Sequence, residues 1–303
     1  MIYTVTLNPS LDYYVQVNNF KTGFVNRVVS DRLAVGGKGI NVSLALRELD
    51  EENMALGFVA GFTGSAIKDK MKCLGLNFNF LETDGQSRIN VKIKGNTETD
   101  INGSGALVSA SDVNALTRKL KRMLKEGDWL VMSGSVPKTL DETTYANILK
   151  KLKTVRGINV VIDACGNLLT ETLKYHPFLI KPNLYELCEI FSLPATPSMD
   201  EIFACAYKLQ QMGARNVIVS MGSSGAAMVT ETSQSLFVRA ARGQLVNSVG
   251  AGDSMIAGFI HEYRVSGNYF SALNYACAAG SACAFTKNLA TKEQIEYIES
   301  LML

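Results

Sequence analysis

An aspartate follows a glycine-rich turn at the start of a predicted helix. Residues 246–263 read VNSVGAGDSMIAGFIHEY, and the apolar residues after Asp253 recur at helical spacing. The turn before it consists of Gly250, Ala251 and Gly252. Unpaired amides at a helix start favour an anion, and Asp253 could accept a proton from a hydroxyl group as charge develops over the turn. The pattern indicates phosphoryl transfer to an alcohol, although glycine before a helix with an aspartate in its first turn is also ordinary capping chemistry.

Glycine and lysine also precede a second predicted helix. The residues Gly36, Gly37, Lys38 and Gly39 stand before INVSLALREL, whose apolar positions suit an amphipathic helix. The spacing GxxxxGK[ST] is absent, which excludes a Walker phosphate loop. The turn SGSVP, residues 133–137, follows a strand-like run, so we expect it at the ligand side of a parallel sheet.

Three further positions allow a structural and a functional interpretation. Asn183 and Glu186, within FLIKPNLYE, are three residues apart, so they can face one site together or form a capping box. The glycines in residues 217–225, VIVSMGSSG, fit a nucleotide-binding turn or a plain hairpin turn. Asp12 lies just beyond the first strand-like run, where an aspartate more often forms a turn than binds a ligand.

Composition restricts the class of protein. The 303 residues are 47% hydrophobic and 19% charged, as in a folded enzyme, and a net charge of +2 gives no reason to expect nucleic-acid binding. The six cysteines form no CxxC pair and have no histidine at metal-ligand spacing, so we expect reduced thiols in the cytoplasm. The sequence shows neither a secretion signal nor an apolar stretch of about 18 residues, so we expect no membrane association.

Strand-like and helix-like segments alternate along the chain. Strand-like runs at 2–7, 128–132 and 157–164 are separated by helical patterns, including 111–125 with Ser111 as its N-cap. The alternation with short links predicts an α/β fold whose mainly parallel sheet is covered by helices on both faces. Residues 87–103 alternate apolar and polar side chains, which predicts a hairpin with one solvated face.

Two of these motifs resemble the signatures of one family. The segment NSVGAGD, residues 247–253, resembles the DTxGAGD signature of the ribokinase-like (PfkB) sugar kinases, and GGKGINVS matches the family's other signature. The resemblance covers nearly the whole chain. It implies one domain, 1–303, with a three-layer ribokinase-like sandwich around a mainly parallel sheet, and a small β-sheet lid from about 12–35 and 87–104. It also implies a homodimer through the lid, with ATP and Mg²⁺ as cofactors.

The resemblance assigns a role to each motif. Asp253 would be the catalytic base, with the amides of Gly250, Ala251 and Gly252 as the anion hole. The substrate would contact Asp12, Arg27, Gly37, Lys38, Asn41, Arg88 and Ser135, of which Arg27, Lys38 and Arg88 would hold its existing phosphate. The nucleotide would lie along Ser220, Gly222 and Gly225, with Lys181 near the triphosphate. Asn183 and Glu186 would organise Mg²⁺, largely through water.

Several motifs narrow the substrate, and one departure affects a cofactor. The segments TVTLNPSLD, RINVKI, ETDING and SGSVP most resemble the branch that uses ATP to phosphorylate fructose 1-phosphate at O6, giving fructose 1,6-bisphosphate. Members acting on tagatose 6-phosphate or fructose 6-phosphate are the alternative, and a non-catalytic sugar-phosphate-binding regulator is a third hypothesis. Asn247 and Ser248 replace the usual Asp-Thr pair, which leaves the base intact but puts the family's monovalent cation, K⁺, in doubt.

Overall fold

The fold consists of a large central sheet and a smaller separate sheet. The computed structural model describes residues 1–302. The central sheet has nine strands in the order β13-β12-β11-β10-β9-β8-β1-β4-β5, and all pairings are parallel except β11–β12 and β12–β13. Its strands are β1 (Ile2–Thr6), β4 (Asn53–Val59), β5 (Leu81–Glu82), β8 (Trp129–Ser133), β9 (Asn159–Asp163), β10 (Leu179–Ile180), β11 (Asn216–Ser220), β12 (Ala226–Val229) and β13 (Ser235–Val238). The predicted α/β fold with a mainly parallel sheet is confirmed.

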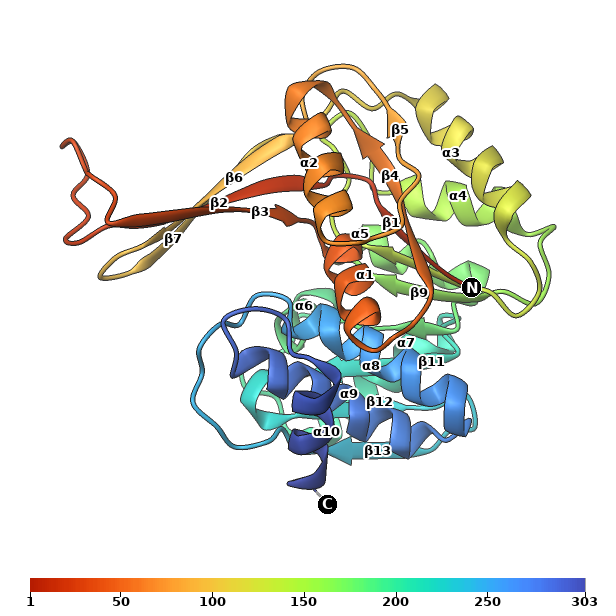
Figure 1. Cartoon of the computed structure of the whole chain (residues 1–303). Helices are drawn as coiled ribbons and strands as arrows, with labels where there is room; N and C mark the ends of the chain where they lie inside the picture. The colour runs from red at the N-terminus through yellow and green to blue at the C-terminus, as the bar shows by residue number, and fades with distance from the viewer. Residues whose placement is uncertain (303) are drawn as a thin grey trace.

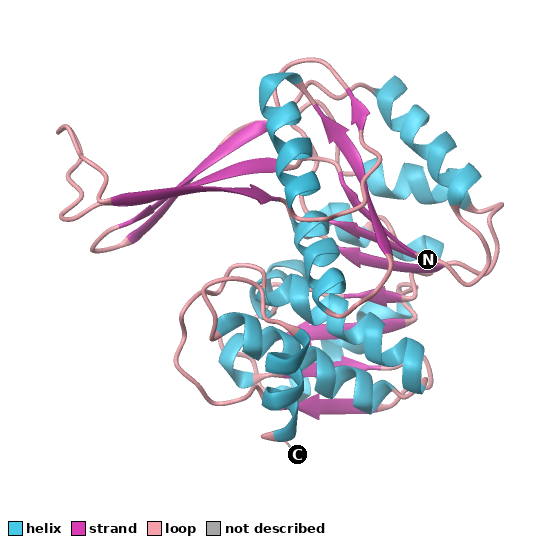
Figure 2. Ribbon diagram, viewed as in Figure 1, coloured by secondary structure: helices cyan, strands magenta, loops and turns pink. Residues whose placement is uncertain are grey.

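Helices cover both faces of the central sheet, which therefore forms the middle of three layers (Figures 1 and 2). On β1, Ile2 packs into the core on one face, and Tyr3 packs into the core on the other. One face carries α1 (Lys38–Glu48), α8 (Ala251–Ser266), α9 (Tyr269–Ala284) and α10 (Lys292–Ser300), and the other carries α3 (Ala110–Met123), α4 (Thr144–Leu152), α5 (Gly166–Thr170), α6 (Leu184–Phe191) and α7 (Met199–Gln211). No helix within residues 1–302 combines the length and apolar character needed to cross a membrane.

The smaller sheet projects from this body as a twisted ribbon (Figure 1). It contains β2 (Ser10–Gln16), β3 (Ser30–Gly36), β6 (Arg88–Lys94) and β7 (Glu98–Asn102) in the order β3-β2-β6-β7. The predicted hairpin of residues 87–103 is the antiparallel pair β6–β7. Helix α2 (Gly61–Cys73) packs Ile67 and Met71 against the base of the small sheet. The small sheet is thereby fixed at its base, while its outer end extends into solvent.

Side-chain caps set several helix starts. The N-cap of α3 is Ser109, whose Oγ and the carboxylate of Asp112 form a capping box, so the prediction of Ser111 was wrong by two residues. Ser111 lies inside the helix because the Ser-x-x-Asp pair two residues earlier satisfies the first amides. Asp50, directly after the C-cap of α1, has a φ of 58°, a left-handed conformation that aspartate tolerates better than most residues.

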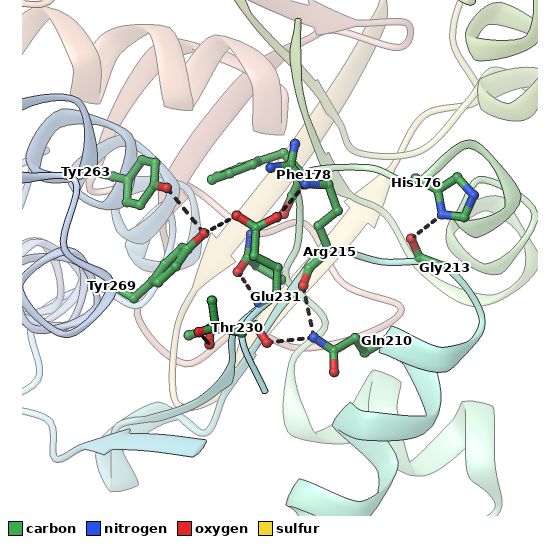
Figure 3. A network of polar contacts seen from close by, with 11 residues as sticks. His176, Phe178, Gln210, Gly213, Arg215, Thr230, Glu231, Tyr263 and Tyr269 are labelled. Atoms are coloured by element: carbon green, nitrogen blue, oxygen red, sulfur yellow. Dashed lines mark hydrogen bonds and ion pairs between the residues drawn. The ribbon is translucent and has the colours of Figure 1, made fainter. Parts of the chain in front are cut away.

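A polar and aromatic network holds the corner between α8 and α9 (Figure 3). The Tyr263 hydroxyl donates to the Tyr269 hydroxyl at 3.2 Å, which donates to Glu231 at 2.6 Å. The other Glu231 oxygen pairs with Arg215 Nε at 2.7 Å, and the Arg215 guanidinium lies over the Phe178 ring. Arg215 directly precedes β11, so this network fixes the far end of α8 at the amino edge of the sheet.

Candidate active site

Polar side chains gather at the carboxyl edge of the central sheet. Three buried oxygens without a hydrogen-bond partner lie there, and they are Thr6 Oγ1, Ser133 Oγ and Asp163 Oδ2. Thr6 ends β1, Ser133 ends β8 and Asp163 ends β9, and these three strands are neighbours. In the sheet, β4 lies on one side of β1, and β8, which comes later in the chain, lies on its other side. The strand order therefore reverses direction beside β1, and open α/β sheets bind ligands at such a reversal. Buried unpaired polar atoms at such a point mark a functional site.

Asp253 lies in the first turn of α8, above this edge. Gly250, the N-cap of α8, adopts a φ of 87°, which glycine accepts at little cost. Asn41, from α1, donates Nδ2 to Asp253 Oδ2 at 2.8 Å, and the carboxylate is 6% exposed. Burial, with a further contribution from the charge of Asp163, raises the pKa of Asp253 to about 6. A carboxylate with this pKa is better matched to removing a hydroxyl proton near neutral pH than an ordinary aspartate.

The start of α8 presents backbone amides without a capping side chain. Ala251 N makes only a long 3.4 Å bond to Ser248 O, and the first regular bond is from Ser254 N to Gly250 O at 2.8 Å. A Cβ placed on Gly252 would lie 3.2 Å from Lys181 Nζ, so the lysine lies beside these amides. Amides, helix dipole and ammonium together favour an anion at this point. An uncapped helix start beside a lysine is what the predicted anion hole would need, and that role stays a prediction.

A buried carboxylate holds two lysines beside the turn. Asp163 Oδ1 lies 3.1 Å from Lys38 Nζ and 3.4 Å from Lys181 Nζ. Burial raises the pKa of Asp163, but the charges of Lys181 and Lys38 outweigh it and lower the pKa overall. Burial lowers the pKa of Lys38, but the carboxylates of Asp163, Glu186 and Asp253 together raise it above its ordinary value. Asp163 thus holds the side-chain nitrogens of both lysines beside the glycine turn.

Asp163 was not among the residues predicted from the sequence. The signal was available, because Asp163 ends the strand-like run VVID, and a polar residue at the carboxyl end of a buried parallel strand points toward a ligand site.

A cavity of about 250 Å³ contains most of the predicted substrate-phosphate residues. Its lining includes Gly37, Lys38, Arg88, Ser135 and Glu186. Arg88 donates Nε to the carbonyl oxygen of Asn8 at 3.0 Å, which leaves the two terminal nitrogens of its guanidinium for an anion. Burial lowers the pKa of Arg88 below its ordinary value, and the charge of the nearby Asp12 offsets only part of this change. Two cations in one small cavity fit a phosphate group.

Arg27 is not part of this cavity within one chain. It is exposed in the loop 17–29 between β2 and β3, which lies at the outer end of the small sheet (Figure 1). The structure therefore does not join Arg27 to Lys38 and Arg88.

Asp12 lies on β2, with its carboxylate buried at the base of the small sheet. Its Oδ1 accepts hydrogen bonds from Ser10 Oγ at 2.7 Å and from Asn90 Nδ2 at 2.8 Å. Its Oδ2 is directed toward Gly36, where an added Cβ would lie only 2.4 Å away. Asp12 does not line the 250 Å³ cavity, but its charge acts on Arg88, which does, so the two side chains lie near each other.

A second cavity, of about 600 Å³, lies on the other side of the α8 start. It is lined by the predicted residues Ser220, Gly222 and Gly225 and by the turn residues Ala251 and Gly252. Further residues on its wall include Met255, Cys277, Gly280 and Phe285, several of them from α9. An apolar wall with small residues suits the flat ring of a nucleobase. Gly222 to Gly225 also form the turn of the antiparallel β11–β12 hairpin, so the hairpin interpretation is observed, and the nucleotide-binding interpretation stays a prediction.

Asn183 and Glu186 form a capping box at the start of α6. Asn183 N donates to Glu186 Oε2 at 2.8 Å, and Glu186 N donates to Asn183 Oδ1 at 2.8 Å. Glu186 nevertheless lines the 250 Å³ cavity, and Asn183 forms a bridge with Ser220, which lines the 600 Å³ cavity. Residues 1–302 contain no group of three acidic, histidine or cysteine side chains suited to a metal. One carboxylate and one amide, from Glu186 and Asn183, fit Mg²⁺, because this ion keeps several waters and uses few protein oxygens.

The chain resembles known carbohydrate kinases along nearly its full length. Residues 6–295 match the pfkB family of carbohydrate kinases. The 1-phosphofructokinase of Bacillus subtilis (strain 168) is 42% identical over 298 residues, which cover 98% of this chain and 97% of that protein. The D-tagatose-1-phosphate kinase of Bacillus licheniformis is 34% identical and covers 99% of this chain and 98% of its own length.

Solved structures support the same relationship at the level of the fold. Phosphofructokinase-2 of Escherichia coli, in complex with potassium, superposes with a TM-score of 0.92 at 24% identity, covering 99% of this chain and 98% of that one. The match of the family over residues 6–295 and the 42% identity to a relative show the predicted family. This chain belongs to the PfkB family of carbohydrate kinases and has their ribokinase-like fold.

Proposed function

We propose that this protein is a 1-phosphofructokinase, which transfers the γ-phosphoryl group of ATP to O6 of fructose 1-phosphate. The observation that carries the proposal is the position of Asp253. This buried carboxylate stands at a helix start without a capping side chain, directly after Ala251 and Gly252, which line the cavity suited to a nucleobase. Its charge acts on Lys38, which lines the cavity that also contains Arg88. The 42% identity to a 1-phosphofructokinase supports this choice of substrate within the family.

The proposed reaction assigns one task to each part of the site. Asp253 removes the proton of the 6-hydroxyl group while O6 bonds to the γ-phosphorus and the bond to the bridging oxygen of ADP breaks. The amides of Gly250, Ala251 and Gly252, with Lys181, stabilise charge on the transferring group. Lys38, Arg88 and Ser135 hold the phosphate at C1, and Asp12 and Asn41 contact sugar hydroxyls. The existing phosphate thus positions the opposite end of the sugar at Asp253.

In this proposal the nucleotide occupies the second cavity, and the residues that would hold the metal lie beside both cavities. ATP lies along Ser220, Gly222 and Gly225, and Mg²⁺ is held near Glu186 and Asn183, largely through water, where it would neutralise the phosphate oxygens. Asn247 is neutral where the DTxGAGD signature has aspartate, so we do not assign K⁺ a protein carboxylate at this position. Its amide oxygen accepts Val249 N at 3.2 Å, which stabilises the loop without a cation. The site of reaction is proposed to be the cytoplasm, where ATP and reduced thiols coexist.

The test is a coupled ADP-release assay with Mg²⁺ and ATP. Fructose 1-phosphate is expected to give the highest kcat/KM when compared with fructose 6-phosphate, tagatose 6-phosphate and tagatose 1-phosphate. A preference for either 6-phosphate would instead assign the phosphate cavity to the other end of the sugar. Retained sugar-phosphate binding without any ADP release would favour the regulator hypothesis. Omission of K⁺ in the same assay tests the cation.

A second candidate substrate is tagatose 1-phosphate, because a tagatose-1-phosphate kinase is 34% identical over almost the whole chain. Both candidate substrates carry the phosphate at C1, so Lys38 and Arg88 serve either one equally. The preference between them depends on the hydroxyl groups of the sugar, which Asp12 and Asn41 would contact.

We also propose that two chains associate through their small sheets. The loop at the outer end of the sheet exposes Phe24 at 72% and Val25 at 88%, and Ile101 on the edge strand β7 is 58% exposed. Edge strands with apolar side chains are rarely left uncovered. A second copy would cover this surface with an identical one, as in a two-fold dimer.

The double variant Phe24→Asp/Val25→Asp is expected to convert a dimer into a monomer, because it places charges in the proposed apolar contact. Size-exclusion chromatography with light scattering measures the mass. Val265→Asp is the matched control, since Val265 is 74% exposed at the end of α8 and far along the chain from the small sheet. A wild-type monomer, or a dimer that survives the double change, would contradict the proposal.

A further inference from the structure

Asn90 connects three strands of the small sheet at the point where Asp12 faces the site. It lies on β6, directly opposite Asp12 on β2 and Asn102 on β7. Its side chain is 5% exposed, and both of its polar atoms are used. Nδ2 donates to Asp12 Oδ1 at 2.8 Å, and Oδ1 accepts Gly103 N at 3.2 Å. The Gly103 contact fixes which way the amide faces, because only its oxygen can accept from a backbone N–H.

The two donors to Asp12 act on the same oxygen. Ser10 Oγ and Asn90 Nδ2 both donate to Oδ1, which fixes the plane of the carboxylate. Oδ2 therefore points past Gly36, where any side chain would collide with it. A charged oxygen held in this way is a strong acceptor for a hydroxyl group, because no rotation is needed when the ligand arrives.

We infer that Asn90 is a positioning residue that aims Asp12 Oδ2 at one sugar hydroxyl group and thereby contributes to discrimination among sugars. This inference rests on the proposed function, in which Asp12 contacts the sugar. A site that pairs with a substrate hydroxyl group rejects an analogue lacking that group, because its own polar atom is then left unpaired. Misaiming Asp12 should remove that discrimination without touching the phosphate contacts of Lys38 and Arg88.

The test compares substrates that differ by one hydroxyl group. Fructose 1-phosphate and its 3-deoxy and 4-deoxy analogues are assayed with wild type and Asn90→Ala. Wild type is expected to disfavour one deoxy analogue strongly. Asn90→Ala should lower kcat/KM for fructose 1-phosphate on the order of 10-fold, mostly through KM, as for a weakened bond to a charged group. For the disfavoured analogue the change should stay within about 2-fold, because the bond is already absent.

Two further variants make the test decisive. Ser10→Ala removes the other donor to Oδ1 with a smaller change of volume, and it should reproduce the same hydroxyl-selective loss even if Asn90→Ala folds poorly. Asn102→Ala is the matched control, since Asn102 pairs with Asn90 in the sheet but is exposed. It should leave all three substrates unchanged.

Additivity provides an independent readout. In an Asp12→Ala background, Asn90→Ala should have no further effect on kcat/KM, because its partner is gone. An equal loss on all three substrates, or additive effects of the two changes, would reduce Asn90 to a structural role and overturn the inference.

Failure of wild type to use fructose 1-phosphate is a separate result. It would reject the proposed substrate, and the same comparison would then be made with deoxy analogues of the sugar phosphate that is used.

Discussion

Replacing Asp253 with asparagine is expected to lower kcat by roughly 10²- to 10⁴-fold, the range for loss of a general base. KM should change little, because asparagine keeps the shape of the side chain and can still accept the hydrogen bond from Asn41. Steady-state kinetics with ATP and fructose 1-phosphate measures both constants. Near-normal turnover by this variant would show that another group accepts the proton.

The pH dependence of wild type follows from the same group. Burial and the charge of Asp163 raise the pKa of Asp253 to about 6, and the base must be ionised to act. Turnover should therefore fall as the pH drops through about 6. The raised pKa also means that ionised Asp253 costs stability above pH 6, and that this cost is relieved as the pH falls below it. The asparagine variant should accordingly melt at a higher temperature than wild type at pH 7.5, which separates loss of chemistry from loss of folding.

Replacing Asp163 with asparagine is expected to damage stability and activity together. Lys181 is 4% exposed and pairs only with this carboxylate among the ion pairs of residues 1–302. Removing one partner of a buried pair leaves an uncompensated charge and typically costs about 3 to 5 kcal/mol. Denaturant unfolding measures this loss. We also expect kcat/KM to fall on the order of 100-fold, because two cations beside the anion hole lose their fixed positions.

A second change distinguishes the two effects of Asp163. In the double variant Asp163→Asn/Lys181→Met, the buried charge is removed with its partner, so stability should recover substantially while activity stays low. Lys119→Met is a control for loss of a lysine, since Lys119 lies on α3, away from this cluster. Equal stability of Asp163→Asn and wild type would contradict the view that this carboxylate holds the two lysines.

The sequence predicted the layers of the fold because its hydrophobic patterns are local. Continuous apolar runs such as residues 2–7 and 157–164 became buried strands, and the alternating residues 87–103 became a hairpin. Boundaries were less predictable, since competing caps two residues apart, Ser109 and Ser111, are decided by which one has an acid three residues later.

The site was predictable where motifs are contiguous. The phosphate cavity brings together Gly37, Lys38, Arg88 and Ser135, which lie up to about 100 residues apart in the sequence. What could not be read from the sequence were pairings across elements, such as Asp163 with two lysines and Asn90 with Asp12. These depend on strand order and register, and no local pattern encodes them. The exposed position of Arg27, at the outer end of the small sheet, likewise depends on how the strands are arranged and could not be read from the sequence.

The network at the corner of α8 and α9 has a consequence for the motions of the protein. Tyr263 and Tyr269 connect α8 to Glu231 near its far end, while Asn41 contacts its first turn, so the buried part of the helix, residues 253–260, is held on both sides. The amide hydrogens of residues 254–260 should exchange with solvent only when much of the sheet opens, whereas those of the exposed residues 18–28 between β2 and β3 should exchange rapidly. The proposed catalytic base, Asp253, thus lies on one of the slowest-opening parts of the chain, and the outer end of the small sheet is one of the fastest.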